Sequence, residues 1–314
     1  MQQFRLGEAT PPGWREPAVT IGNFDGVHRG HQALVRATVA SARAHSGTAL
    51  VLTFDPHPAR VLAPSRAPAN LTTPAQKAEL LAALGTDGVV TLPFDAGVAA
   101  LAPEVFVARV LVETLGARHV VVGEGFRFGR GQSGDAATLG RLGSERGFTV
   151  EAMAAVLHGG EPVSSSRVRE ALAAGDVVLA RELLGRDYFV DATVVPGDGR
   201  GRTIGIPTAN LECDNEIVPA RGVYAGRVRT SGGAWHPAVA NRGLRPTFGG
   251  STETVEAHLL DFGGDLYGSR VRLAFVHRLR EERRFAGPEP LLAQIRDDVA
   301  RARALLSTAA GGGV

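Results

Sequence analysis

The segment GNFDGVHRGH, residues 22–31, decides the fold of the first half of the chain. It follows an apolar run that ends at Ile21, and the residues after it, QALVRATVA, continue as a helix. The order predicts a strand, a tight glycine-containing turn and a helix. Such a junction leaves backbone N–H groups unpaired at the helix start, where the helix dipole adds about half a positive charge. The segment is therefore suited to binding a polyphosphate.

Two histidines in this segment, His28 and His31, are candidate catalytic residues. If the helix begins between them, a spacing of three lets both imidazoles project toward the same phosphate. In nucleotidyl transfer an attacking phosphate displaces pyrophosphate from the α-phosphorus of ATP. Fixed hydrogen-bond donors stabilise the developing charge without forming a covalent bond. We therefore predict an electrostatic role for both rings.

The pattern around this segment predicts a parallel sheet covered by helices, because short apolar runs alternate with amphipathic stretches over residues 19–152. Strands are expected to begin near Val19, Ala49, Gly88, His119 and Phe148. Helices are expected to begin near Gly30, Pro74, Pro103 and Asp135. Two more helices, capped by the serines at 164–166 and by Asp176, should end by Gly185.

After Gly185 the pattern changes to short alternating segments separated by glycine, proline and asparagine turns, which predicts an antiparallel barrel. The segments lie near Phe189, Val223, Trp235, Thr254 and Val271, and a final helix is expected from Pro288 to Leu306. We therefore predict an α/β protein with a Rossmann-like domain at 1–185 and a β-barrel domain at 186–314. The length of 314 residues agrees, since it exceeds what one core usually organises.

Composition excludes several classes of site. The formal charge is only +2, so nucleic-acid binding is not indicated. The single cysteine, Cys213, cannot form an internal disulfide, and no Cys/His cluster has zinc-site spacing. Lys77 is the only lysine and does not lie in a GxxxxGK[ST] loop. Because we find neither a signal-peptide core nor a run of ~20 apolar residues, we expect a cytoplasmic protein without membrane association.

The 22–31 segment resembles the HxGH signature of nucleotidyltransferases in the extended form GxFDGxHxGH of bacterial flavin adenylyltransferases. Three further segments resemble that family in the same order: TFDPHP at 53–58, GEGFRFGRGQSGD at 123–135 and SSSRVR at 164–169. The resemblance implies nucleotide contacts at Gly22, Phe24, Asp25, Gly30, Ser164, Ser165, Arg167 and Arg169. It implies flavin contacts at Asp55, Pro56, His57, Phe126 and Phe128. The chain departs from the family at Gly125, where Asp or Asn is usual, and at Ser166.

A second glycine-rich stretch, VVPGDGRGRTIGIPTANLE at 194–212, leads into Thr208 and Asn210. A hydroxyl and a side-chain amide two residues apart on an extended segment face the same way and offer hard oxygen ligands. Mg²⁺ or a similar divalent cation, bound together with nucleotide phosphate, fits such a pair. Thr208 and Asn210 are therefore candidate metal ligands.

This stretch, together with the segments that follow it, resembles riboflavin kinases. The matching segments are GVYA at 222–225, RPTF at 245–248, VEAHLLDF at 255–262, DLYG at 265–268 and LREERRF at 279–285. The resemblance implies nucleotide contacts at Gly201, Gly205, Pro207, Thr208 and Asn210, and a flavin contact at Arg284. It also implies that Glu256 accepts the proton of the flavin ribityl hydroxyl, the task of a general base in phosphoryl transfer.

Both resemblances imply one bifunctional transferase with riboflavin, FMN and ATP as its partners. It would phosphorylate riboflavin to FMN and adenylylate FMN to FAD, releasing pyrophosphate. Gly125 leaves open a riboflavin kinase with an impaired or inactive adenylyltransferase domain. An RNA-linked protein is disfavoured, because tRNA synthetases pair HxGH with a lysine-bearing KMSKS-type loop. A non-catalytic flavin-binding module would not explain two phosphate sites, and the sequence leaves homo-oligomerisation open.

Overall fold

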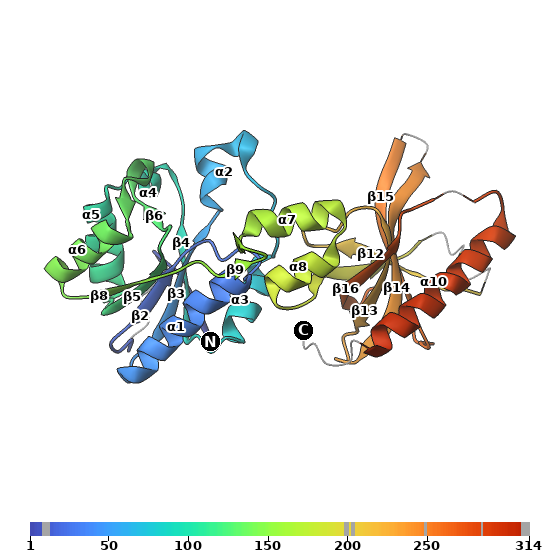
Figure 1. Cartoon of the computed structure of the whole chain (residues 1–314), viewed down its shortest axis with the longest axis horizontal. Helices are drawn as coiled ribbons and strands as arrows, with labels where there is room; N and C mark the ends of the chain where they lie inside the picture. Colours follow the sequence, from blue (N-terminus) through green and yellow to red (C-terminus); the bar gives the residue numbers. More distant parts are fainter. Residues whose placement is uncertain (8–12, 198–200, 202–204, 248–249, 284, 309–314) are drawn as a thin grey trace. The chain divides into compact units, whose positions relative to one another are not determined.

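The structure is a computed structural model that describes residues 1–7, 13–197, 201, 205–247, 250–283 and 285–308 (Figure 1). Contacts between residues divide the chain into two compact units, Met1–Ser164 and Ser165–Val314. Each unit has its own sheet and its own hydrophobic core, so each is described by itself.

The first unit contains a six-stranded sheet in the order β1-β4-β3-β2-β5-β8, and every neighbouring pair is parallel. This confirms the predicted parallel sheet. The strands are β1 (Gln2–Arg5), β2 (Ala18–Ile21), β3 (Ala49–Asp55), β4 (Gly88–Pro93), β5 (His119–Gly123) and β8 (Thr149–Met153). The edge strand β1 was not predicted, because its sequence QQFR is almost entirely exposed and lacks an apolar run.

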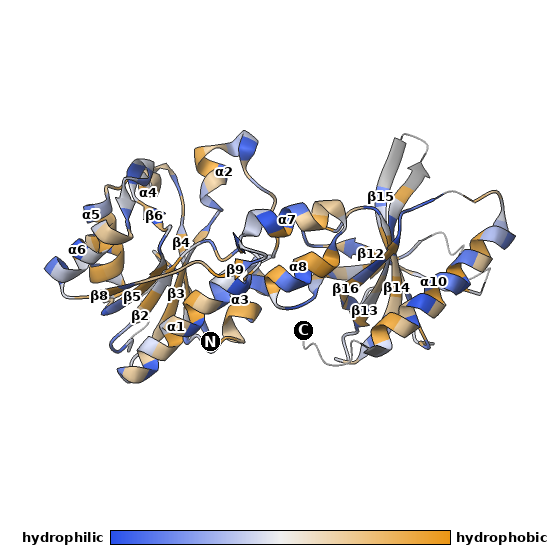
Figure 2. Cartoon of the chain, in the orientation of Figure 1, coloured by the Kyte–Doolittle hydropathy of each residue, from blue (hydrophilic) through white to orange (hydrophobic). Residues whose placement is uncertain are grey.

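Helices cover both faces of this sheet. They are α1 (Arg29–Ala44), α2 (Pro58–Leu62), α3 (Pro74–Ala82), α4 (Ala96–Ala99), α5 (Pro103–Phe106), the π-helical segment η2 (Val107–Thr114) and α6 (Ala136–Arg146). Leu52 packs on one face with Leu111 and Leu139, while Val51 packs on the other with Val35 and Leu81. Successive strand residues therefore enter different cores, and the central strands are hydrophobic along their length (Figure 2).

Short elements complete this unit. They are the 3-10 turns η1 (Pro64–Arg66) and η3 (Arg130–Gln132), and the two-residue strand pairs β6 (Arg127–Phe128) with β7 (Gly134–Asp135) and β9 (Leu157–His158) with β10 (Glu161–Pro162).

The order of strands places the 22–31 segment at a ligand-binding position. From β2 the chain proceeds through α1 to β3 and β4 on one side, and later returns to β5 on the other side of β2. In open parallel sheets the crevice beyond the carboxyl ends of the strands at such a reversal is where ligands bind. Gly22 directly follows Ile21, the last residue of β2. The fold therefore places the glycine-containing turn in that crevice.

The second unit confirms the predicted antiparallel barrel and terminal helix. Its barrel is closed in the order β11-β12-β15-β14-β13-β16. The strands are β11 (Tyr188–Val195), β12 (Ala209–Cys213), β13 (Gly222–Arg229), β14 (Trp235–Thr247), β15 (Gly250–Leu259) and β16 (Arg270–Arg280). The terminal helix α10 (Pro288–Thr308) packs Ala302 and Leu306 against Val223, Ala225 and Val276 of the barrel.

Two helices precede the barrel and belong to the same unit, α7 (Ser165–Ala174) and α8 (Val177–Leu184). Arg181 of α8 donates to the Asp187 carboxylate and to the Val276 carbonyl of β16. Contacts therefore place both helices with the barrel, whereas the sequence pattern placed the domain boundary after them, at 185/186.

Candidate functional sites

The turn between β2 and α1 is held in an unusual backbone conformation by buried side chains. Phe24 and Val27 have positive φ angles, 49° and 42°, on either side of Gly26. A positive φ is unfavourable for a bulky residue and more so for a β-branched one. Both side chains are fully buried against Val35 and Leu81. The hydrophobic core therefore fixes the conformation that presents the start of α1.

The two histidines of the turn lie together, as the spacing suggested. His28 is the N-cap of α1, and its Nδ1 accepts the His31 backbone N–H at 3.3 Å. The two rings stack with centroids 3.6 Å apart. Because Nδ1 accepts this hydrogen bond, it carries no proton, and the ring proton of His28 is on Nε2.

His31 is electrostatically distinct from His28. Burial, and then the neighbouring His28 and Lys77, hold the pKa of His31 well below its usual value. Its Nδ1 is buried without a hydrogen-bond partner within the described part of the chain. A buried ring nitrogen without a partner is unfavourable, and a ligand at this site would relieve the cost.

Gly30 allows close approach at the start of α1. A Cβ atom added there would lie 3.1 Å from Cε1 of His28 and 3.6 Å from the Val163 carbonyl oxygen. The chain just before Ser164 therefore lies against this helix start. Ser165 begins α7, whose first turns contain Arg167 and Arg169.

The side chains of Phe24 and Asp25 are buried in the protein and do not face solvent. The Asp25 carboxylate is buried and accepts the Leu71 N–H at 3.0 Å and both the N–H and the hydroxyl of Thr72 at 3.2 Å. The Gly26 N–H donates to the same hydroxyl at 3.2 Å. Asp25 thus fastens the turn to the segment before α3, a role that its position in the motif did not reveal.

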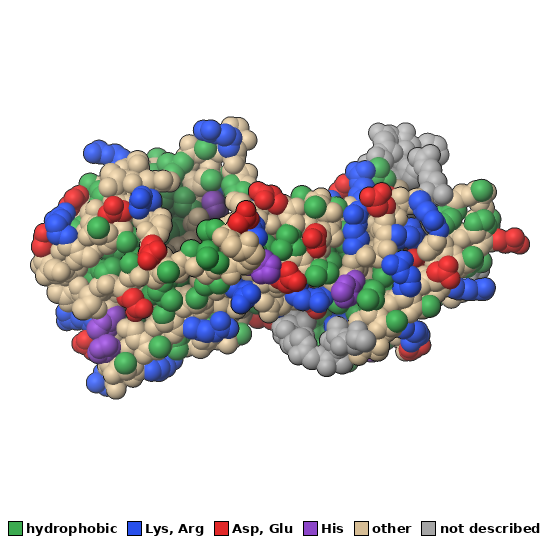
Figure 3. Space-filling view, viewed as in Figure 1, with side chains coloured by type: hydrophobic (Ala, Val, Ile, Leu, Met, Phe, Trp, Pro, Cys, Tyr) green, Lys and Arg blue, Asp and Glu red, His purple; other side chains and the backbone are tan. Residues whose placement is uncertain are grey.

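A cavity of about 310 Å³ adjoins this turn and contains two of the predicted flavin-contacting residues, Asp55 and His57. Its polar lining also includes Asn23, whose Nδ2 lies 3.2 Å from Nε2 of His57, and Lys77. Asp55 forms an ion pair with Arg5 at 3.3 Å. Figure 3 shows this unit hollowed near α2, with hydrophobic side chains in the hollow.

Phe126 and Phe128 do not line that cavity. Their rings stack at 5.4 Å, and Phe128 is buried in the core against Phe106. A Cβ atom at the neighbouring Gly125 would meet no atom within 4 Å. The structure therefore gives Phe128 a packing role and leaves room for a side chain at position 125.

In the second unit, strand register brings the predicted residues together. Glu256 of β15 lies opposite Asn210 of β12 on one side and opposite Asn241 of β14 on the other. Directly opposed residues of antiparallel strands share one face of the sheet. Thr208 lies just before β12 and lines one cavity together with Glu256. Asn241 was not predicted, because only the register identifies it as a neighbour of Glu256.

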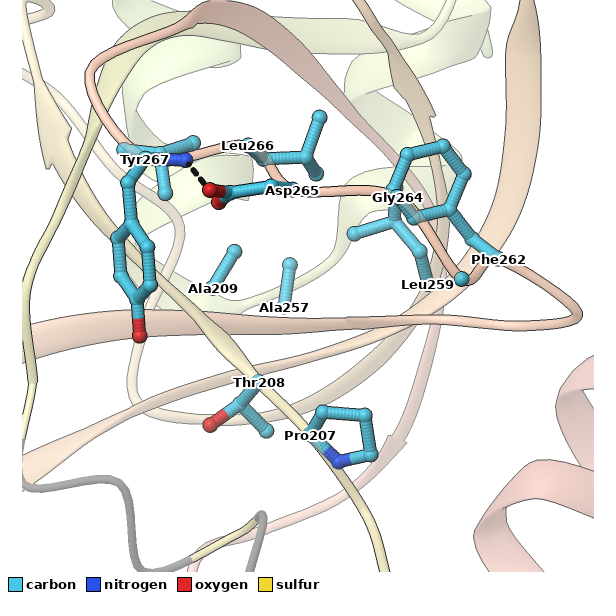
Figure 4. Close-up of a pocket in the computed structure, with 12 residues that line it drawn as sticks. Pro207, Thr208, Ala209, Ala257, Leu259, Phe262, Gly264, Asp265, Leu266 and Tyr267 are labelled. Atoms are coloured by element: carbon cyan, nitrogen blue, oxygen red, sulfur yellow. Dashed lines mark hydrogen bonds between the residues drawn. The ribbon is translucent and has the colours of Figure 1, made fainter.

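Two cavities meet at Thr208. One of about 360 Å³ is lined by Thr208, Pro207, Ala209, Ala257 and the 262–267 loop, where the Tyr267 N–H donates to Asp265 (Figure 4). The other, of about 330 Å³, is lined by Thr208, Glu256 and His258, and by Leu291 and Ile295 of α10. Thr208 therefore lies on the border between a loop-covered cavity and a helix-covered one.

Two glycines, Gly197 and Gly201, pack closely on this border. A Cβ atom at Gly197 would lie 2.1 Å from Nδ2 of Asn210, and one at Gly201 would lie 3.3 Å from Oγ1 of Thr208. Nδ1 of His258 donates to the Pro207 carbonyl at 2.7 Å. These contacts hold the Thr208–Asn210 segment in place. Arg284 and Phe248 lie outside the described residues.

The donors at this site fit a hard divalent cation. Mg²⁺ is commonly bound by one or two protein oxygens, with water and phosphate oxygens as its other ligands. The Thr208 hydroxyl and the Asn210 side-chain oxygen are suitable protein ligands of this kind. Within the described ranges, no cluster of three or more His, Cys, Asp or Glu residues could hold a metal.

The fold and the two sites define a two-domain enzyme of phosphate-group transfer, in which a nucleotidyltransferase sheet precedes a kinase barrel. The family model described as FAD synthetase matches residues 11–167, and the one described as riboflavin kinase matches residues 184–306. A bifunctional riboflavin kinase/FMN adenylyltransferase of Pseudomonas fluorescens is 43% identical over 99% of both chains. That of Escherichia coli K12 is 41% identical over 91% of both chains. The chain belongs to this bifunctional family.

A solved structure supports the same architecture. It is titled a macrolide-efflux protein from Streptococcus pneumoniae, is 29% identical, and matches with a TM-score of 0.87 over 96% of this chain and 99% of its own. Among the described residues, no helix has the length and apolar character needed to span a membrane.

Proposed function

We infer that this enzyme phosphorylates riboflavin to FMN and then transfers AMP from ATP to FMN, which yields FAD and pyrophosphate. The observation that carries this inference is the match to bifunctional relatives along both units. It favours the bifunctional enzyme over a kinase with an inactive first domain. Cytoplasmic location remains a prediction.

For the kinase step we propose that riboflavin occupies the helix-covered cavity, because Glu256 lines it. The nucleotide would occupy the loop-covered cavity, so that its γ-phosphate reaches Thr208 at the border. Glu256 accepts the proton of the ribityl hydroxyl as that oxygen attacks the γ-phosphorus. Thr208 and Asn210 would hold Mg²⁺, which when bound neutralises phosphate charge.

For the adenylyl step we propose that the ATP phosphates lie at the start of α1. His28, through its Nε2–H, and neutral His31 stabilise charge that develops as the FMN phosphate attacks the α-phosphorus and pyrophosphate leaves. Gly22 and Gly30 permit close approach, and Phe24 and Asp25 would contact the nucleotide only through their backbone, since their side chains are engaged inside the protein.

We further propose that the serine-rich turn, with Ser164, Ser165, Arg167 and Arg169, binds the phosphates of ATP at a second helix start. These residues lie before position 185, so the functional boundary between adenylyltransferase and kinase is proposed at 185/186. The riboflavin kinase family model begins at residue 184, next to this boundary, which supports the proposal.

The test is product analysis of the purified protein incubated with Mg-ATP and either riboflavin or FMN. We expect FAD from both substrates. Riboflavin that stops at FMN, together with FMN that stays unchanged, would refute the adenylyl step and leave the kinase step standing.

A further inference from the structure

Lys77, the only lysine in the chain, lines the cavity beside the histidine pair, although its sequence position in a plain helix gave no such indication. It lies in α3, which begins with a capping box between Thr73 and Gln76. Leu81 of the same helix is fully buried. The Asp25–Thr72 bonds tie the start of this helix to the turn that carries His28. The helix that carries Lys77 is thus anchored to the turn that carries His28.

The charge of Lys77 is balanced by nearby carboxylates to which, in the described part of the chain, it is not bonded. Its pKa is lowered chiefly by burial, while Asp25 and Asp55 act in the opposite direction from a distance. The Asp25 carboxylate bonds to Leu71 and Thr72, and that of Asp55 pairs with Arg5. Among the described residues, no hydrogen bond or ion pair engages the Lys77 ammonium.

The Lys77 ammonium is partly buried, and the Asp25 and Asp55 carboxylates favour its charge without bonding to it. An anion bound directly to the ammonium would offset more of the cost of burial. The cavity already offers Asn23 and His57 as polar neighbours, and Lys77 is near enough to His31 to lower its pKa. An anion bound at Lys77 would therefore lie beside the proposed site of adenylyl transfer.

We propose that Lys77 binds the phosphate of FMN and makes the first domain selective for FMN over riboflavin. This rests on the proposed function. The attacking phosphate carries nearly two negative charges at neutral pH, and it must approach the α-phosphorus of an anionic ATP. Lysine offers a compact charge suited to a phosphate oxygen. It stays protonated while the new P–O bond forms and the bond to pyrophosphate breaks.

The selectivity follows from chemistry alone. Riboflavin has the same ring system as FMN but no phosphate, so contacts with the ring treat both alike. A cation that contacts the phosphate strengthens FMN binding only, which keeps riboflavin from occupying the adenylyltransferase site unproductively.

The experiment compares Lys77→Met, Lys77→Arg and a control, Arg36→Met, which removes the same charge from the exposed face of α1. FAD formation is measured against FMN concentration, with riboflavin as a competitive inhibitor. We expect Lys77→Met to raise KM for FMN by about 10–100-fold, the value of a charge-assisted hydrogen bond. The inhibition constant of riboflavin should not change. Lys77→Arg should recover part of the loss, and Arg36→Met should match wild type.

The outcomes that would overturn the proposal are separate from those that would overturn the function. An unchanged KM for FMN, a parallel rise in the riboflavin inhibition constant, or a rise confined to KM for ATP would each refute the role of Lys77. Wild-type protein that forms no FAD would instead refute the proposed adenylyl step. Riboflavin kinase turnover serves as the internal control, and Lys77→Gln replaces Lys77→Met if the latter does not fold.

Discussion

Glu256 lies directly opposite Asn210 in the ladder between β12 and β15, and opposite Asn241 in the ladder with β14. The carboxylate is thus flanked on the same face by two side-chain amides, one of them a candidate magnesium ligand. This arrangement requires β15 to pair with β12 on one side and with β14 on the other.

Replacing Glu256 by Gln should lower riboflavin phosphorylation by about 10²–10⁴-fold, because a positioned general base contributes that much. FAD synthesis from supplied FMN should continue. The matched control is Glu253→Gln, which alters a carboxylate of the same strand that pairs with Arg221 and Arg242. Unchanged kinase turnover in Glu256→Gln would remove this residue as the base.

Gly197→Ala should selectively impair the kinase. The new methyl group would lie 2.1 Å from Nδ2 of Asn210 and would force that side chain to move. We expect a higher magnesium requirement and at least tenfold slower FMN formation, measured by titrating Mg²⁺ at saturating riboflavin. Gly232→Ala is the control, since its methyl group would be 3.9 Å from the nearest atom. Equal magnesium dependence in both variants would contradict a ligand role for Asn210.

His28→Ala should reduce FAD formation from FMN by about 10²–10³-fold, comparable to loss of one donor to developing charge. FMN formation should be retained because the kinase site lies on the barrel. His119→Ala removes a histidine from the beginning of β5, at the opposite ends of the strands, and should leave both activities near wild type. Loss of both activities in a folded His28→Ala protein would argue against independent sites.

Gly125→Asn tests the departure from the family pattern. Because a Cβ at this position meets open space, the denaturation midpoint should stay within experimental error of wild type. Adenylyl transfer should be equal to or faster than wild type, measured as kcat/KM for FMN. A loss greater than tenfold would show that the site is shaped around glycine.

Acid should destabilise the first unit through His31. Its pKa in the folded protein is lowered by burial and by neighbouring positive groups, so the unfolded chain binds a proton that the folded chain resists. The contribution of neutral His31 to the free energy of unfolding is therefore complete above the pKa of His31 in the unfolded chain, near 6.5. It is lost as the pH falls below that pKa. Urea unfolding at pH 7 and pH 5 should show a smaller difference in His31→Asn than in wild type. His119 and His277 are shifted in the same direction, so only the comparison between variants isolates His31.

Much of the fold follows from local patterns. The five parallel strands predicted from apolar runs are present, and α3 begins at the predicted Pro74, the first residue after its Thr73 cap. Five of the six barrel strands also follow from alternation and turns, whereas β12 was not among the predicted segments. Strand β1 was not predicted because its own residues are mostly exposed and show no strand pattern. Its strand conformation depends on pairing with β4.

The sites were predictable to different degrees. The His28–His31 pair and the Thr208–Asn210 pair depend on short spacings, which sequence reveals. The Asp25–Thr72 bonds, the Asn241 neighbour of Glu256 and the place of Lys77 in the cavity depend on segments brought together by folding. Phe128 was predicted as a flavin contact, yet it packs in the core, so that contact remains without structural support.

Thr208 belongs to the lining of two cavities at once, and this has a consequence for inhibitor design. If the nucleotide and riboflavin occupy the two cavities as proposed, a single compound that joins a flavin-like ring to a purine through a phosphate-length linker would pass over Thr208 and occupy both. Once one end is bound, the other is held at a high effective concentration near its own cavity. Such a tethered molecule would bind more tightly than either half, and a substitution in one cavity would leave its other end bound.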